Sequence, residues 1–445
     1  MSRQTALKVL TAVRTRGAWA DAALPAQLRQ AGLDRKDASL CSRIVYGVLQ
    51  NQLLLDFYLE SFCTQPLDHL QPPLADILRI GAYQILYLDK VPDSAAVNSA
   101  VELAKSSGRS RASGLVNAVL RNLARNKDAL PAVPEEDPVK ALSIRTSHPR
   151  WLVKRLLALL GREEAEALLK ADNAPAPMTA QVNTLRAGPA GLREELAAEG
   201  VEARPLEWLP DCLILSGSGD LEQLSAFREG KFYIQDPAAR MAVLAAGLQP
   251  GDRVLDTCAA PGGKSFAVAI ALGDRGEILA CDLHERKLGR VRAGAERLGL
   301  SSISAAAADG RVFRPEWEAA FDAVLVDAPC SGLGIIRKKP DVRYKDLESL
   351  FAMPVIQRAI LDNAARYVRP GGTLLYSTCT ILPEENQGVT DGFLGEHPDF
   401  QRTPFVLQLE AAETAAGQVT LWPHRHGTDG FYICRMTRRA VRGDV

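Results

Sequence analysis

Residues 254–265 read VLDTCAAPGGKS, and this stretch decides the fold class of the chain. An aliphatic run that ends in an acid passes into a turn of small residues and then into an apolar helix over 265–272. The same alternation continues downstream, with strand candidates at 277–281, 303–308, 321–326 and 372–377 and helices at 285–298 and 355–368. Strands that alternate with helices predict right-handed βαβ units, and therefore an α/β fold with a mostly parallel, Rossmann-like sheet.

The regions on either side of this sheet have different patterns. After it, residues 418–422 and 431–436 are joined by a polar turn with glycine, which predicts a C-terminal antiparallel hairpin. Before it, apolar residues at helical spacing fill residues 1–130, and the prolines between 131 and 138 are typical of a linker. We therefore expect an all-α domain over 1–135, a small α+β module over 140–230 and an α/β domain over 231–440.

Composition limits the classes of function. Of the 445 residues, 47% are hydrophobic and the formal net charge is zero, which excludes a mainly disordered chain. No apolar run approaches the ~18–20 residues that cross a bilayer, and no signal-peptide pattern follows Met1, so a cytoplasmic protein is expected. The eight cysteines form no Cys-x-x-Cys pairs and have no histidines at metal spacing, so neither a disulfide framework nor a metal site is expected.

The turn that follows Asp256 is suited to bring a ligand close to the backbone. Its small side chains expose N–H groups at a helix N-terminus, which favours polar or anionic ligands. A phosphate-binding loop would need a glycine where the chain has Cys258, and the G-x-G-x-x-G of a nicotinamide site is absent. S-adenosylmethionine is the third candidate ligand.

Two acids at the ends of later strand candidates favour this third ligand. Asp282 closes the strand 277–281, where a carboxylate can accept two hydrogen bonds from a ribose diol. Asp309 follows the weak strand 303–308 and is placed to border an adenine. Alone, each acid is more simply a helix N-cap, but their succession at strand ends favours ligand binding.

Two cysteine motifs end at the same predicted edge of the sheet. Residues 327–332 read DAPCSG and residues 377–380 read STCT. A lone cysteine is usually only a small apolar residue, but Cys330 and Cys379 would be two thiols at adjacent strand tips beside a methyl donor. Such a pair favours covalent catalysis by a thiolate, which a nearby cation or helix N-terminus is expected to assist.

Three blocks resemble the signature motifs of the RNA 5-methylcytosine methyltransferases: 256–264 (DTCAAPGGK), 327–332 (DAPCSG) and 377–386 (STCTILPEEN). The resemblance implies that Cys379 attacks C6 of cytosine and that Cys330 assists release of the product. DNA cytosine methyltransferases instead attack with the Pro-Cys cysteine, so this assignment depends on family membership and not on spacing.

The same resemblance assigns the remaining site residues. Asp327 would hydrogen-bond the N3/N4 edge of cytosine and stabilise charge on the ring, and Lys264 joins it in the catalytic set. The implied contacts to S-adenosylmethionine are made by Cys258, Ala259, Ala260, Pro261, Gly262, Gly263, Lys264, Asp282, Asp309 and Asp327.

The amino-terminal region carries a second resemblance. Residues 77–88, 91–92, 96–104 and 116–121 are similar to the helical RNA-binding factor NusB. A NusB-like domain ahead of this catalytic domain is the layout of family members that modify 16S ribosomal RNA, which is therefore the expected partner. Residues 1–130 hold 16 Lys/Arg against 11 Asp/Glu. RNA contacts are expected from an acid-free run of six cations: Lys105, Arg109, Arg111, Arg121, Arg125 and Lys127.

Other interpretations remain open at this point. On composition alone, the basic run is more simply a solvated helix face. A tRNA cytosine-5 methyltransferase would use the same chemistry, although the NusB-like region disfavours it. A non-catalytic RNA-binding assembly factor would need neither thiol. We expect the chain to act as a monomer.

Overall fold

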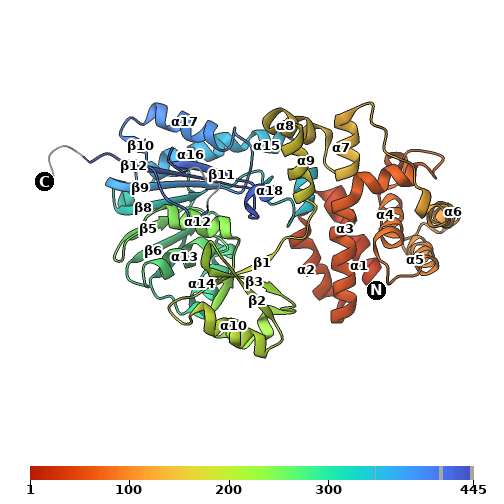
Figure 1. The fold of residues 1–445 in the computed structure, drawn as a ribbon, viewed down its shortest axis with the longest axis horizontal. Helices are drawn as coiled ribbons and strands as arrows, with labels where there is room; N and C mark the ends of the chain where they lie inside the picture. The colour runs from red at the N-terminus through yellow and green to blue at the C-terminus, as the bar shows by residue number, and fades with distance from the viewer. Residues whose placement is uncertain (346, 410–413, 441–445) are drawn as a thin grey trace. The chain divides into compact units, whose positions relative to one another are not determined.

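The computed structural model describes residues 1–345, 347–409 and 414–440. The chain divides into two compact units. A helical unit comprises Met1–Ala174 and the short segment Ile336–Lys345, and an α/β unit comprises Pro175–Ile335 and Asp346–Val445. Figure 1 follows the chain from the red N-terminal helices to the blue C-terminal strands.

Nine α-helices build the described part of the helical unit. They are α1 (Ser2–Arg16), α2 (Ala20–Ala31), α3 (Arg35–Glu60), α4 (Pro72–Tyr87), α5 (Asp93–Ser106), α6 (Ser113–Arg125), α7 (Pro138–Thr146), α8 (Arg150–Leu160) and α9 (Arg162–Ala171). The α4 helix is buried along most of its length. Gly47 lets α3 pack closely against α4, because a Cβ at this position would lie 1.9 Å from Cζ of Tyr83.

One feature of this unit differs from what the sequence predicts. The helical periodicity of residues 151–170 predicts a single helix, but the structure breaks it into α8 and α9 at Gly161, whose φ of 76° an L side chain rarely adopts. Both helices lie within the compact helical unit. The exact boundaries of the three expected domains remain predictions.

The segment Ile336–Lys345 is far from the other helical-unit residues in sequence. Its 3-10 turn, η6 (Pro340–Tyr344), contains Arg343, which is fully buried. Arg343 Nη1 donates to Asn173 Oδ1 at 3.0 Å and to the carbonyl of Ser147 at 3.1 Å. Nearby, the backbone N–H of Ala20 donates to Asp341 Oδ2. These buried contacts fix the segment within the helical unit.

The α/β unit begins with a small antiparallel sheet in the order β2-β3-β1-β4. Its elements are β1 (Met178–Val182), α10 (Pro189–Ala198), β2 (Glu202–Leu206), β3 (Leu209–Ser216), η4 (Leu221–Gln223), α11 (Ser225–Arg228) and β4 (Phe232–Ile234). Leu192 and Leu196 of α10 pack with Leu213 and Phe232 in a core of their own.

The large sheet has the order β10-β12-β9-β8-β5-β6-β7, with β11 paired to β12. Its strands are β5 (Arg253–Asp256), β6 (Glu277–Asp282), β7 (Ile303–Ala307), β8 (Phe321–Asp327), β9 (Val368–Thr378), β10 (Phe400–Arg402), β11 (Gln418–Leu421) and β12 (Phe431–Arg438). Strands β5 to β9 pair in parallel, and β10 to β12 pair antiparallel. The expected Rossmann-like α/β fold with a C-terminal hairpin is confirmed.

Helices cover both faces of this sheet (Figure 1). One face carries α12 (Pro237–Ala245), α13 (Gly263–Ala271) and α14 (Glu285–Leu298), and the other carries α16 (Met353–Ala365) and α17 (Gln387–Glu396). Neighbouring side chains of a strand pack on opposite faces of the sheet: Val254 lies in the hydrophobic core on the first face and Leu255 in the core on the second. Burial on both faces explains why the strands read as continuous apolar runs. The short helices α15 (Leu347–Phe351) and α18 (Pro423–His426) lie outside these layers.

None of the helices in the described ranges is long and apolar enough to span a bilayer. A search of the same ranges finds no cluster of three or more His, Cys, Asp or Glu side chains that could hold a metal ion.

Candidate active site

The strand order places a crevice at the carboxyl ends of β5 and β8. These neighbours pair in parallel, but the chain leaves β5 toward β6 on one side and reaches β8 on the other. Ligands of doubly wound sheets bind where the order reverses in this way. Asp256 ends β5 and Asp327 ends β8, so two carboxylates border this position.

The turn between β5 and α13 has no room for larger side chains. Gly262 has a φ of 115°, and a Cβ there would lie 2.5 Å from the ring of Phe266. A Cβ on Gly263 would lie 2.9 Å from Nε2 of Gln235. The sequence motif therefore holds a backbone cradle at the start of α13, where N–H groups are open to a ligand. Cys258 is not a reactive thiol, because burial raises its pKa to about 12.

Asp256 lies under this cradle and is completely buried. Its Oδ2 accepts a hydrogen bond from Ser265 Oγ at 2.7 Å, while Oδ1 has no hydrogen-bond partner among the described residues. Burial raises the pKa of Asp256 to about 6, and the nearby Asp327 carboxylate acts in the same direction. A buried polar atom without a partner at a ligand crevice fits a site that a polar ligand completes.

The two acids expected to bind the cofactor differ in their surroundings. Asp282 ends β6, and its Oδ1 accepts from the backbone N–H of His284 at 3.0 Å. Asp309 follows β7, and a bidentate contact with Arg311 lowers its pKa. A small cavity lies between these strand ends and the helix α16, lined by Leu255, Thr257, Cys281, Ala308, Asp309, Gly310, Trp317, Asn363 and Tyr367. With a volume of about 10 Å³, this cavity has room for about one water molecule and not for a nucleobase, so the position of the adenine stays a prediction.

Lys264 and Asp327 form an ion pair at the end of β8. Lys264 Nζ lies 2.6 Å from Asp327 Oδ2, and Ser377 Oγ donates to Asp327 Oδ1 at 2.9 Å. The ring of Phe431 lies 5.0 Å from the Lys264 ammonium. Both carboxylate oxygens of Asp327 are thereby fixed, and each keeps a lone pair that can accept from a substrate.

The two thiols predicted at adjacent strand tips come together. Cys330 Sγ lies 3.3 Å from Cys379 Sγ, and both side chains are partly exposed. The backbone fixes this approach, because the N–H of Ala328 donates to the carbonyl of Ser377 and the N–H of Gly334 donates to the carbonyl of Cys379. No side chain has space at Gly334, where a Cβ would lie 1.8 Å from the carbonyl oxygen of Gly430.

The surroundings of Cys330 favour its protonated form. The hydrogen bond with Cys379 raises the pKa of Cys330 well above its ordinary value, and burial adds to the effect. Cys330 therefore stays protonated at neutral pH and can donate to a thiolate on Cys379. Cys330 Sγ is the one side-chain atom that the described structure places in hydrogen-bonding contact with Cys379 Sγ, so the cation expected beside the nucleophile is not in direct contact with it.

The six cations of the expected RNA contact surface lie at the ends of α5 and α6 and in the loop that joins these helices. All are exposed except Arg109, which is half-buried. Two of the six are already paired: Lys105 contacts Glu102 and Lys127 contacts Asp93, both at 2.8 Å. These pairs leave fewer cations for phosphate groups than the sequence suggests.

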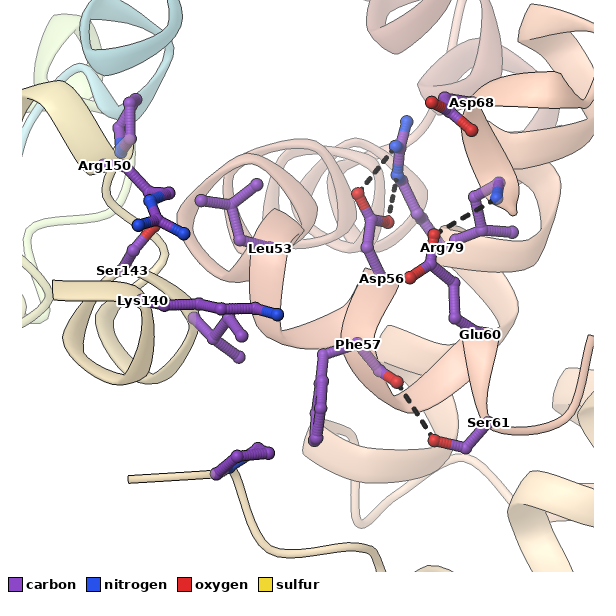
Figure 2. A pocket seen from close by; sticks show the side chains of 14 residues that line it. Leu53, Asp56, Phe57, Glu60, Ser61, Asp68, Arg79, Lys140, Ser143 and Arg150 are labelled. Atoms are coloured by element: carbon purple, nitrogen blue, oxygen red, sulfur yellow. Dashed lines mark hydrogen bonds and ion pairs between the residues drawn. The ribbon is translucent and has the colours of Figure 1, made fainter. Parts of the chain in front are cut away.

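The helical unit also contains a pocket of about 740 Å³ (Figure 2). Leu53 and Phe57 of α3 form an apolar part of its wall, and Lys140 points its ammonium group into the space. Asp56 lines the pocket and pairs with Arg79 at 2.7 Å. Because acidic and basic groups both line this pocket, it has no preference for the polyanionic backbone of RNA.

Sequence reasoning missed several residues that support the site. Gln235, Ser377 and Phe431 contact the cradle, Asp327 and Lys264 respectively. Ser377 belongs to the STCT motif and Phe431 to the C-terminal hairpin, but neither pattern predicts the contact that the residue makes. Their roles arise from contacts between distant segments, which no local pattern encodes.

Comparisons with known proteins agree with this geometry. The profile of the 16S rRNA methyltransferase RsmB/F family matches residues 243–437, the NusB family matches 1–125, and the RsmF/B-like ferredoxin-like domain matches 148–222. The probable ribosomal RNA small subunit methyltransferase B of Bacillus subtilis is 37% identical, covering 98% of both chains. The chain belongs to the RsmB family of rRNA methyltransferases. The expected resemblances to this family and to NusB are confirmed.

Further relatives match the RsmB family assignment over the whole chain. The ribosomal RNA small subunit methyltransferase B of Pseudomonas syringae is 34% identical and covers 99% of this chain and 97% of its own. The solved structure of PH0851 is 28% identical, with a TM-score of 0.82, and covers 97% of this chain and 98% of that chain. Membership of the RsmB family makes the chain an S-adenosylmethionine-dependent rRNA methyltransferase, and it confirms the cofactor that the cradle and its two acids predicted.

Proposed function

We propose that this RsmB-family chain methylates carbon 5 of a cytosine in 16S ribosomal RNA, through a transient bond between Cys379 and C6 of the base. The observation that carries the proposal is the pair of thiols 3.3 Å apart at the edge of the sheet that also bears the cradle and the Lys264–Asp327 pair. A binding module would need neither thiol, and an N- or O-methyltransferase would have no use for a covalent nucleophile.

The cofactor site consists of the cradle over Cys258–Lys264 together with Asp282, Asp309 and Asp327. The cradle N–H groups and the partnerless Asp256 Oδ1 fit the polar part of S-adenosylmethionine, and the carboxylate of Asp282, whose Oδ1 accepts from His284 N–H, would accept from a ribose diol. Asp309, which follows β7, would border its adenine. When bound, S-adenosylmethionine supplies an electrophilic methyl group.

The target cytosine must leave its stack to reach this edge. Asp327 is oriented by Lys264 and Ser377, and its free lone pairs accept from the N4 amino group on the N3/N4 edge of cytosine. Addition of the Cys379 thiolate to C6 turns C5 into an enamine-type carbon, which takes the methyl group and leaves S-adenosylhomocysteine as the second product. A base then removes the proton of C5, the bond from Sγ to C6 breaks to return the Cys379 thiolate, and the protonated Cys330 assists this release.

Substitution of the two thiols tests the chemistry. Cys379→Ser is expected to abolish methyl transfer while cofactor affinity stays nearly unchanged, because no hydrogen bond within the described ranges joins Cys379 to the cradle. Cys330→Ala is expected to trap a protein–RNA adduct that survives a denaturing gel and is absent from the double variant. Full activity of the Cys379→Ser variant contradicts the nucleophile assignment.

Bisulfite mapping of RNA from cells that lack the protein tests the substrate. Loss of a 5-methylcytosine in 16S ribosomal RNA, restored by the wild-type gene and not by the Cys379→Ser variant, supports the proposal. Loss confined to transfer RNA would instead establish the tRNA methyltransferase, and no loss with retained RNA binding would favour an assembly factor.

A further inference from the structure

A buried carboxylate outside the assigned site joins the two loops that carry the thiols. Glu385 lies in the PEEN sequence that follows Cys379, and its side chain is almost completely buried. Its Oε2 accepts from the backbone N–H of Ser331 at 2.8 Å and from Gln357 Nε2 at 2.9 Å. Its Oε1 accepts from Thr380 Oγ1 at 3.2 Å.

The donors to Glu385 are the immediate neighbours of the two cysteines. Ser331 follows Cys330 in the chain, and Thr380 follows Cys379. The hydroxyl groups of Ser331 and Thr380 are themselves 2.7 Å apart. A donor chain therefore runs from Ser331 Oγ through Thr380 Oγ1 to the carboxylate, and it crosses from one thiol loop to the other.

Gln357 of α16 extends this network to the other side of Cys330. Its Nε2 donates to Glu385 and also to the carbonyl of Pro329 at 2.9 Å. The residue before Cys330 and the residue after it are thus held through the same carboxylate. We call Ser331, Gln357, Thr380 and Glu385 the thiol latch.

The charge of this carboxylate is costly to bury. Within the ranges that the structure describes, Glu385 makes no ion pair with a cation, and only neutral donors face it. An ionised carboxylate in such surroundings is retained at the expense of stability, which is common for groups that serve function. Its field acts on the neighbouring thiol, because Glu385 is one of the groups that raise the pKa of Cys330, after Cys379 and burial.

We propose that Glu385 is a positioning residue for methyl transfer, which holds the Cys330 and Cys379 loops at their working separation through the thiol latch. This inference rests on the proposed covalent chemistry. Glu385 touches neither substrate nor cofactor in this role, and acts through Ser331 and Thr380 on the thiols. Loss of the latch separates the thiols, whereas loss of its charge alone keeps the separation and lowers the pKa of Cys330.

Two substitutions at Glu385 separate these effects. Glu385→Ala removes both carboxylate acceptors of the latch. We expect a displacement of about 1 Å at the reacting atoms to lower the single-turnover rate on the order of 100-fold, with cofactor affinity unchanged. Glu385→Gln can still accept from Ser331 and Gln357 and donate to Thr380, so it is expected to keep most of the rate. Without the buried negative charge the pKa of Cys330 is lower, so the alkaline limb of the pH–rate profile, where Cys330 loses its proton, moves toward lower pH.

A thiol readout tests the latch without RNA. Two thiols and one oxidised glutathione give the Cys330–Cys379 disulfide and two reduced glutathiones, and the equilibrium constant reports how often the two sulfurs meet. We expect this constant, followed by mass spectrometry of the cysteine peptides, to fall about tenfold in the Glu385→Ala variant and to stay unchanged in the Glu385→Gln variant. Thr380→Val removes one arm of the latch with little change in volume and is expected to act like Glu385→Ala.

Thr390→Val is the matched control. Thr390 is buried in α17 and its hydroxyl lies 2.9 Å from that of Tyr432, and within the described residues it makes no hydrogen bond to a member of the latch. Its loss is expected to lower stability without changing the rate or the glutathione equilibrium. The inference is overturned if Glu385→Ala and Thr380→Val both keep the wild-type rate and the wild-type glutathione equilibrium. It is also overturned if Glu385→Gln is as impaired as Glu385→Ala and its pH–rate profile does not shift. If the wild type methylates no cytosine, the proposed function fails, while the glutathione equilibrium still decides the latch.

Discussion

Asp256 provides a quantitative test of the cofactor crevice. Its carboxyl group is fully buried below the cradle, one oxygen lacks a partner, and burial raises its pKa from 3.8 to about 6. A raised carboxyl pKa means that the folded state holds the proton more tightly than the unfolded state. The contribution of this carboxyl group to the free energy of unfolding is therefore fully present below about pH 3.8, and it is lost as the pH rises through about 6.

The magnitude follows from these two pKa values. Ionisation of Asp256 lowers the free energy of unfolding by about 1.6 kcal/mol at pH 5 and by about 3 kcal/mol at pH 7, relative to strongly acidic solution. Asp256→Asn cannot ionise and keeps an acceptor for Ser265. Its stability relative to wild type should therefore increase by about 1.3 kcal/mol between pH 5 and pH 7. The amide group facing the position of Oδ1 adds a penalty that does not vary with pH.

Urea unfolding read by hydrogen exchange and mass spectrometry measures this difference, because peptides from β5 and α13 report the α/β unit separately from the helical unit. Asp322→Asn is the matched control. The Asp322 carboxylate accepts from the N–H of Arg253 and pairs with Arg369, and its pKa is lowered, so its contribution varies only below pH 4. A pH-independent difference between Asp256→Asn and wild type from pH 5 to pH 7, or a decrease over that range, would refute the reasoning.

Three further substitutions test other parts of the chain. Lys264→Met breaks the 2.6 Å ion pair with Asp327. Because the carboxylate then loses its orientation, the methyl-transfer rate should fall on the order of 100-fold. A single-turnover rate within about threefold of the wild-type rate contradicts this prediction. Arg343→Met leaves several buried acceptors of the helical unit without a donor and should cost about 3 kcal/mol, measured by urea unfolding of that unit; an unchanged midpoint counts against it. Arg121→Gln should reduce the salt dependence of RNA binding by about one phosphate contact. Arg29→Gln, which replaces an exposed cation of the same unit, should leave the salt dependence unchanged. If the slope of log affinity against log salt concentration is the same for both variants, Arg121 does not contact the RNA.

Local sequence determined the elements of the α/β unit closely. The helix predicted over 285–298 has those bounds in the structure, and the strand predicted at 277–281 gains only Asp282. Strand propensity, small-residue turns and helical periodicity all act over a few residues, so they can be read directly from the chain. The break at Gly161 was missed, because a helical pattern continues on both sides of a single glycine.

The sequence alone also determined that two thiols, a glycine-rich cradle and three carboxylates end at one edge of a parallel sheet, since strand direction fixes which ends share an edge. Only the tertiary structure decided that the two sulfurs lie 3.3 Å apart and that Asp327 is held between Lys264 and Ser377. It alone revealed that Glu385 accepts hydrogen bonds from both thiol loops. Such contacts join residues up to 63 positions apart, and their distances depend on how the whole sheet and its helices pack, which no local pattern records.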